Sequence, residues 1–104
     1  DLDVFTREFT QSGFRGPINW YRNFERSWER TAQLADARIE QPALFIAGER
    51  DAVIAWSGSQ LKRMPTIMPN LRETLMLPGC GHWVQQERPA EVNAALLRFL
   101  SELK

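Results

Sequence analysis

The strongest constraint on the fold is an uninterrupted apolar run near the middle of the chain. The run PALFIA occupies positions 42–47, follows a largely polar stretch at 36–41 and ends at Gly48. A short continuous apolar segment that stops at a glycine predicts a β-strand covered on both of its faces. Strands of this kind are typical of parallel sheets with helices on either side, so the run favours an α/β fold.

The rest of the second half alternates between helix and strand patterns. A modest helix is predicted at 58–64, ending near Pro65, and a weaker strand follows at 71–77. The clearest helix is predicted at 89–103, because Pro89 suits a first helical turn and apolar residues recur at spacings of three and four. The right-handed crossover rule then places two parallel strands side by side, with helices packed against them.

The first part of the chain carries helix patterns only. A short helix is predicted at 4–10, with a glycine stop at Gly13. A second helix is predicted to start at Gly16-Pro17 and to end by about Leu34, because aromatic residues recur four apart along it. This aromatic stripe consists of Trp20, Phe24 and Trp28, with Tyr21 beside it.

These patterns predict a helical segment at 1–38 and a strand–helix segment at 39–104. A chain of 104 residues is long enough for one domain with a single core. Two strands do not complete a parallel sheet, so we expect further strands to come from residues outside this sequence or from another chain. The chain starts DLDVF, without Met or a signal segment, and we interpret it as beginning within a larger sequence.

Charge and composition exclude several classes of function. Thirteen basic and thirteen acidic residues cancel, so no net charge favours binding to nucleic acid or to an anionic membrane. No apolar run approaches the roughly 20 residues that span a bilayer. Cys80 has no second cysteine to pair with, which is compatible with a reducing compartment. We therefore expect a soluble, cytoplasmic domain.

Titratable side chains follow both predicted strands. The segment GERDAV at 48–53 contains Asp51, and the segment PGCGHW at 78–83 contains His82, the only histidine. Ligands of open α/β sheets bind at the carboxyl ends of the strands, where neighbouring loops can form an Asp–His pair. In such a pair the carboxylate orients the imidazole and stabilises the imidazolium, which leaves the other ring nitrogen as a general base.

Each candidate residue also has a structural interpretation. A lone loop histidine is usually a hydrogen-bonding surface residue, and an aspartate after a strand is often a helix cap or a turn former. Glu49 is a rival carboxylate in the same loop. Tyr21 is by default a core residue, since buried tyrosines mostly serve packing. Cys80 is by default a small buried filler, because a metal site built on Cys80 and His82 lacks two further ligands.

Four stretches of the sequence, taken in order, carry a family resemblance. They are SGFRGPINWYRN at 12–23, PALFIAGERD at 42–51, PNLR at 69–72 and LPGCGHWVQQERPAEVN at 77–93. Together they strongly resemble the C-terminal part of the α/β-hydrolase-fold epoxide hydrolases and span nearly the whole chain. The resemblance implies the C-terminal portion of that α/β fold at 39–104, with two parallel strands and flanking helices. It also implies that 1–38 are the last helices of the cap.

The resemblance assigns roles to the matching residues. It implies that His82 is the general base, that Asp51 orients it, and that Tyr21 is one of two cap tyrosines that hold and protonate the epoxide oxygen. In such enzymes an aspartate attacks a ring carbon, and water activated by the histidine hydrolyses the resulting alkyl-enzyme ester to a vicinal diol. Neither a metal nor an organic cofactor takes part.

The nucleophile and the second cap tyrosine cannot be placed in this sequence. The resemblance therefore implies the N-terminal part of the same enzyme as a partner, and we predict that the chain alone is inactive. The aromatic residues indicate an apolar pocket, so the expected substrate is a lipophilic epoxide rather than a sugar or a phosphate. The residues assigned to this pocket are Trp20, Phe24 and Trp83.

Two other functions stay open for the sequence taken alone. A haloalkane or haloacid dehalogenase, or an esterase on the same scaffold, shares Asp51 and His82, and Tyr21 discriminates because a dehalogenase has no such alkoxide to protonate. A non-catalytic interaction module is the second alternative, since many aromatic residues on an incomplete sheet leave apolar surface for a partner. Homodimer formation is left open by the same reasoning.

Overall fold

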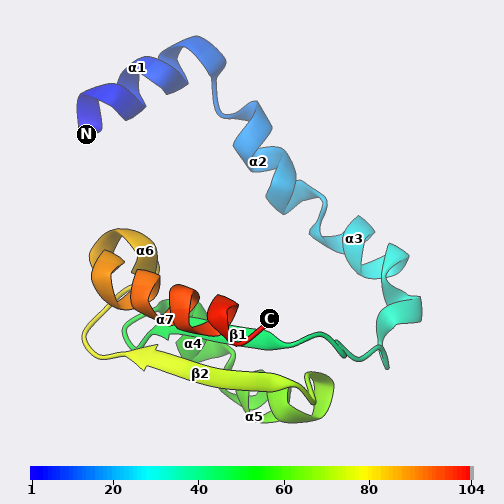
Figure 1. Cartoon of the computed structure of the whole chain (residues 1–104). Helices are drawn as coiled ribbons and strands as arrows, with labels where there is room; N and C mark the ends of the chain where they lie inside the picture. The colour runs from blue at the N-terminus through cyan, green and yellow to red at the C-terminus, as the bar shows by residue number, and fades with distance from the viewer. Residues whose placement is uncertain (104) are drawn as a thin grey trace. The chain divides into compact units, whose positions relative to one another are not determined.

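The computed structural model describes residues 1–103, which fall into two compact units that divide between Ala37 and Arg38. The first unit is helical throughout, and the second contains both strands (Figure 1). The elements of the first unit are α1 (Leu2–Ser12), α2 (Arg15–Arg22), α3 (Phe24–Arg30) and the 3₁₀ turn η1 (Ala32–Leu34). No residue of Asp1–Ala37, all of which the structure describes, is buried.

The helix predicted from Gly16 to about Leu34 is wrong as a single element. The backbone amide of Asn23 donates to the carbonyl oxygen of Trp20 at 3.3 Å. Its side-chain amide donates to the carbonyl oxygen of Asn19 at 2.7 Å, which is the acceptor that a regular helix would offer to the backbone amide. Such local side-chain bonds compete with the regular helical pattern. Thr31 interrupts the pattern again, with its hydroxyl on the carbonyl oxygen of Ser27 at 2.8 Å. The aromatic stripe is therefore carried by two short helices.

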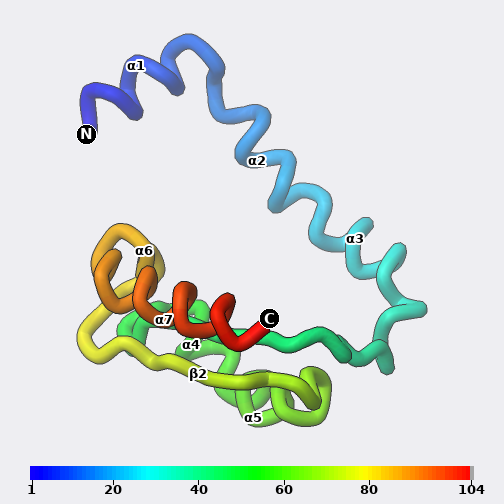
Figure 2. The backbone as a smooth tube through the Cα atoms, in the orientation of Figure 1, coloured from blue at the N-terminus to red at the C-terminus, as the bar shows by residue number. Residues whose placement is uncertain are grey.

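The second unit alternates strand and helix, in agreement with the predicted fold class. Its elements are β1 (Ala43–Gly48), α4 (Ala52–Trp56), α5 (Gly58–Ile67), β2 (Leu71–Leu77), α6 (Val84–Glu87) and α7 (Pro89–Ser101). Both predicted strands are confirmed. They pair in parallel, and the register places Gly48 opposite Leu77, so the two strands end side by side. Figure 2 follows the chain from β2, in yellow, through a loop into α6 and α7, in orange and red.

Two helix predictions in this unit need correction, and two further helices were not predicted. Helix α5 continues past Pro65 to Ile67, because a proline in the last turn forfeits only one helical bond and the Met68 amide still donates to Met64 at 2.7 Å. Helices α4 and α6 were not predicted, since elements of five and four residues are too short to show a periodic apolar pattern. Helix α7 ends at Ser101 rather than at 103.

The core of the second unit lies where α7 and the loop after β2 meet the sheet. Its buried residues are Ala47, Leu77, Cys80, Val92 and Ala95. Cys80 is only 1% exposed, which confirms its prediction as a small buried filler. The prediction of a strand buried on both faces is wrong for most of β1, since only its last two residues are buried here. The two-stranded sheet of the described chain covers less of β1 than a full parallel sheet does.

A helix that crosses a bilayer needs about 20 predominantly apolar residues. Within residues 1–103, no helix is both long enough and apolar enough to do so.

Candidate active site

Two loops leave the sheet at the edge where β1 and β2 end. The Arg50 amide donates to the carbonyl oxygen of Cys80 at 2.9 Å, which ties the loop after β1 to the loop after β2. Gly48 permits this approach, because a Cβ there would collide with the carbonyl oxygens of Cys80 and Gly81. The backbone itself therefore holds the two loops together before any side chain contributes.

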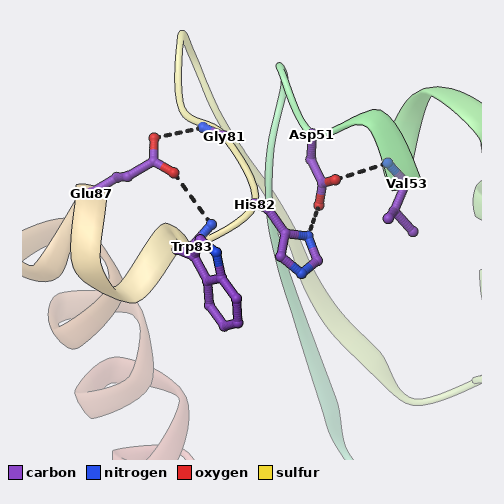
Figure 3. Close-up of polar contacts among 6 residues, drawn as sticks. All are labelled: Asp51, Val53, Gly81, His82, Trp83 and Glu87. Atoms are coloured by element: carbon purple, nitrogen blue, oxygen red, sulfur yellow. Dashed lines mark hydrogen bonds and ion pairs between the residues drawn. The ribbon is translucent and has the colours of Figure 1, made fainter. Parts of the chain in front are cut away.

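Asp51 connects one of these loops to the other. Its Oδ1 accepts a hydrogen bond from the Val53 amide at 2.8 Å and so caps α4, while its Oδ2 lies 2.8 Å from Nδ1 of His82 (Figure 3). The residue is 8% exposed. The helix-cap interpretation and the Asp–His interpretation are both correct, because each carboxylate oxygen serves one of them. Glu49, the rival carboxylate, is exposed.

The electrostatics of this pair favour a charged carboxylate. The pKa of Asp51 lies below its ordinary value, chiefly because the His82 side chain hydrogen-bonds the carboxylate, although burial opposes this shift. When Nδ1 carries the hydrogen it donates to Oδ2, and Nε2 is left as an acceptor. The side chain of His82 is 55% exposed, so water can reach the ring. The pair can therefore act as an oriented general base.

The loop that carries His82 is held from the other side by Glu87. Its Oε2 accepts a hydrogen bond from the Gly81 amide at 2.7 Å, and its Oε1 accepts one from the Trp83 amide at 3.2 Å. The indole of Trp83 stands edge-on to the imidazole of His82, with ring centroids 5.0 Å apart. Sequence reasoning assigned no role to Glu87; the available signal was its place in the stretch HWVQQERP.

The predicted cap residues lie in the first unit and line one hollow there. Tyr21, Trp20 and Phe24, together with Gly16 and Pro17, surround an open space of about 660 Å³. The ring of Tyr21 stands edge-on to Phe24 at 5.5 Å. The default core interpretation of Tyr21 is wrong, since this residue is 69% exposed. Trp83, the third predicted pocket residue, belongs to the second unit.

A metal site requires several acidic, cysteine or histidine side chains close together. In the described part of the chain, no three of them gather closely enough to hold an ion.

The fold and the site together define the class of protein. Parallel strands that end side by side, an aspartate after one and a histidine after the next, and a helix packed on the sheet form the C-terminal part of an α/β-hydrolase fold. No protein-family model matches the chain. Relatives and solved structures identify the branch of that fold, because over its whole length the chain is homologous to the C-terminal part of epoxide hydrolases.

Three comparisons carry this statement. The chain is 47% identical over 104 residues to epoxide hydrolase A of Mycobacterium tuberculosis and covers 32% of that protein. It is 42% identical over 104 residues to epoxide hydrolase B of the same species and covers 29% of it. In the structure of an epoxide hydrolase from an endophytic Streptomyces, 31% of that chain matches 99% of this one, with a TM-score of 0.93 and 48% identity. The chain thus spans about a third of the length of these relatives, and the predicted resemblance is confirmed.

Proposed function

We propose that this chain is the C-terminal part of an epoxide hydrolase that converts a lipophilic epoxide to a vicinal diol. The observation that carries the proposal is the 2.8 Å hydrogen bond between His82 and Asp51 where two parallel strands end. The 47% identity to epoxide hydrolase A over all 104 residues supports the choice of reaction. In this proposal residues 1–38 are the last helices of the cap and residues 39–104 belong to the core.

The first half of the reaction opens the epoxide ring. An aspartate from the N-terminal part of the enzyme attacks a ring carbon, the C–O bond breaks with its electron pair on oxygen, and an alkyl-enzyme ester forms. The phenol of Tyr21 hydrogen-bonds the epoxide oxygen and transfers a proton to it, because an alkoxide needs a donor as its charge develops. Trp20, Phe24 and Trp83 provide apolar contact for the rest of the substrate.

The second half of the reaction hydrolyses the ester. Nε2 of His82 removes a proton from water as the water oxygen attacks the ester carbonyl carbon. The charged carboxylate of Asp51 keeps the hydrogen of the neutral ring on Nδ1 and stabilises the imidazolium that forms. Collapse of the tetrahedral intermediate breaks the ester bond, and the departing diol oxygen takes the proton from the imidazolium. The nucleophile leaves as a carboxylic acid that carries the second proton of the water, and transfer of this proton through solvent to the phenolate of Tyr21 regenerates both the carboxylate and the phenol.

The proposed partner of the chain is the N-terminal part of the same enzyme. That part supplies the nucleophile and the second cap tyrosine, so the chain alone should not turn over an epoxide. Formation of a homodimer is a further proposal, and native mass spectrometry of the complete protein tests it. The cytoplasmic location, suggested by the single cysteine, stays a prediction.

The two half-reactions can be separated in the complete protein that contains this chain. After rapid mixing with a chromogenic aryl epoxide and an acid quench, mass spectrometry measures the ester as an added mass equal to that of the epoxide. His82→Asn should form the ester and accumulate it, and Tyr21→Phe should slow its formation. Trp28→Phe is the matched control, because Trp28 is an exposed aromatic residue that does not line the hollow around Tyr21.

Two results would contradict the proposal. One is unchanged turnover of the epoxide by His82→Asn, which would show that His82 is not the general base. The other is the absence of any covalent adduct in both the wild type and His82→Asn. Unchanged ester formation by Tyr21→Phe would contradict the role of Tyr21 alone and would favour a dehalogenase or an esterase.

A further inference from the structure

Two backbone amides, one on each side of His82, converge on a single carboxylate. The Gly81 amide donates to Oε2 of Glu87 at 2.7 Å and the Trp83 amide donates to Oε1 at 3.2 Å. Figure 3 shows the two bonds reaching Glu87 on one side of the loop, while Asp51 bonds the imidazole on the other. The backbone is thus held at the Cys80–Gly81 and His82–Trp83 peptide groups, which lie on the two sides of His82, separately from the ring.

Helix capping explains only half of this arrangement. Trp83 is the residue before α6, and Glu87 is the last residue of that helix, so a side-chain bond back to the Trp83 amide resembles one half of a capping box. The Gly81 amide belongs to no helix, yet its bond to Glu87 is the shorter of the two. The bond between the Gly81 amide and Glu87 therefore stabilises the loop and not the helix.

The loop needs such a restraint because of its composition. Gly79 has a φ of 67°, and a second glycine directly precedes His82, so the free backbone has wide conformational freedom. Gly81 also lets the carboxylate come close, since a Cβ there would lie 2.9 Å from Oε1 of Glu87. Both hydrogen bonds and the close approach at Gly81 therefore place the Glu87 carboxylate against this loop.

The carboxylate is ionised at neutral pH and can accept both hydrogen bonds. The pKa of Glu87 lies below its ordinary value, chiefly because the Gly81 amide donates to it, with a smaller contribution from the Trp83 amide. An ionised carboxylate offers acceptor positions on both oxygens, whereas an amide side chain offers one oxygen and presents donors on the other side. Substitution of Glu87 by glutamine should therefore preserve the shape of the side chain and lose one of the two bonds.

We propose that Glu87 is a positioning residue for the proposed general base: its carboxylate fixes the backbone on both sides of His82, so that Asp51 has only the orientation of the ring to set. The inference rests on the proposed function for the step it affects. That step is hydrolysis of the ester, which uses His82, and not formation of the ester, which does not. Misplacement of a reacting group by about 1 Å costs on the order of 10²-fold in rate.

The test compares Glu87→Gln and Glu87→Ala with wild type in the complete protein. Rapid-quench mass spectrometry gives the rate constants for ester formation and ester hydrolysis separately. We expect hydrolysis to slow by about 10-fold in Glu87→Gln and by up to about 10²-fold in Glu87→Ala, with ester formation unchanged. Glu91→Gln is the matched control, because the only side-chain bond of Glu91 among residues 1–103 is a 3.5 Å pair with Arg88, and its rates should equal those of wild type.

Hydrogen exchange provides a readout that does not depend on the reaction. The peptide that contains residues 78–84 should exchange its amide hydrogens faster in Glu87→Gln than in wild type or Glu91→Gln. An unchanged exchange rate overturns the inference, and so does an equal slowing of both half-reactions, because that pattern indicates damage to the fold as a whole.

The outcomes separate this inference from the proposed function. A wild-type protein that forms no ester contradicts the function, and the exchange measurement still decides whether Glu87 restrains the loop. A wild-type protein that forms and hydrolyses the ester, together with Glu87 variants of normal hydrolysis rate, contradicts the inference alone. Glu87→Gln keeps the size of the side chain, so it carries the test where Glu87→Ala does not fold.

Discussion

Replacement of Gly48 by alanine should disturb the Asp–His pair without touching either of its members. A Cβ at position 48 would lie 2.6 Å from the carbonyl carbon of Cys80 and closer still to the carbonyl oxygens of Cys80 and Gly81, whereas ordinary contact begins at 3.4 Å. The loop after β2 must therefore retreat by at least about 0.8 Å. The obstructing atoms belong to the backbone, and no side-chain rotation relieves the contact. Position 48 has no positive φ, so the effect is steric and not conformational.

The retreating loop carries His82 away from Asp51. A retreat of about 0.8 Å along the Nδ1–Oδ2 line, the smallest that the contact with Cys80 requires, lengthens this distance from 2.8 Å to about 3.6 Å, which is beyond the range of a hydrogen bond. The imidazole then loses both its orientation and the partner of its imidazolium form. We expect hydrolysis of the ester to slow by on the order of 10²-fold, and ester formation to keep its wild-type rate.

The measurement is a single-turnover experiment on the complete protein, with quenched samples analysed for the ester and the diol. Gly58→Ala is the control, because nothing lies within 4 Å of a Cβ at that position, and it should behave as wild type. A Gly48→Ala protein that hydrolyses the ester at the wild-type rate would refute the reasoning. A crystal structure of that variant with the Asp51–His82 bond still at its original length would refute it as well.

Three further predictions follow from the same site. Asp51→Asn should slow ester hydrolysis by on the order of 10⁴-fold, because the amide presents a donor to His82 and favours the wrong tautomer; quenched samples should then contain accumulated ester. The folded-state pKa of Glu87 is depressed below its ordinary 4.5, so its stabilisation is fully present above pH 4.5 and is lost as the pH falls through the folded-state pKa. In urea unfolding, the stability difference between wild type and Glu87→Gln should therefore shrink below pH 4.5. Burial, and then the charge of Glu87, raise the pKa of the Cys80 thiol, so iodoacetamide at neutral pH should label Cys80 only after denaturation, as measured by mass spectrometry.

The parts of the fold that could be predicted depend on patterns several residues long. The apolar runs ending at Gly48 and Leu77 marked both strands, and the parallel pairing then brought Asp51 and His82 to one edge. The interruption of the second helix at Asn23 could not be predicted, because it depends on one side-chain amide that replaces a backbone donor. Burial was overestimated for β1. Its apolar sequence indicates that the strand is suited to burial on both faces, but residues 1–103 bury only its last two residues.

The candidate site divides in the same way. Asp51 and His82 were predictable, since each follows a strand and carries a titratable group. The contribution of Glu87 was not, because it acts through backbone amides, and every residue except proline has one. Whether a given amide bonds to a carboxylate depends on the path of the loop. The sequence does not determine this path, because the two glycines of the loop allow many backbone conformations.

The parallel pairing of β1 with β2 also has a consequence for how such enzymes change over time. Every group proposed here to activate the hydrolytic water is encoded between Gly48 and Glu87, in one uninterrupted stretch, whereas the nucleophile of the proposed reaction is encoded elsewhere. Recombination upstream of this stretch can therefore exchange the attacking group, or the pocket residues Trp20 and Phe24, and inherit the water-activating groups intact. Chimeras joined just before position 42 offer a direct route to new specificities on the same hydrolytic half.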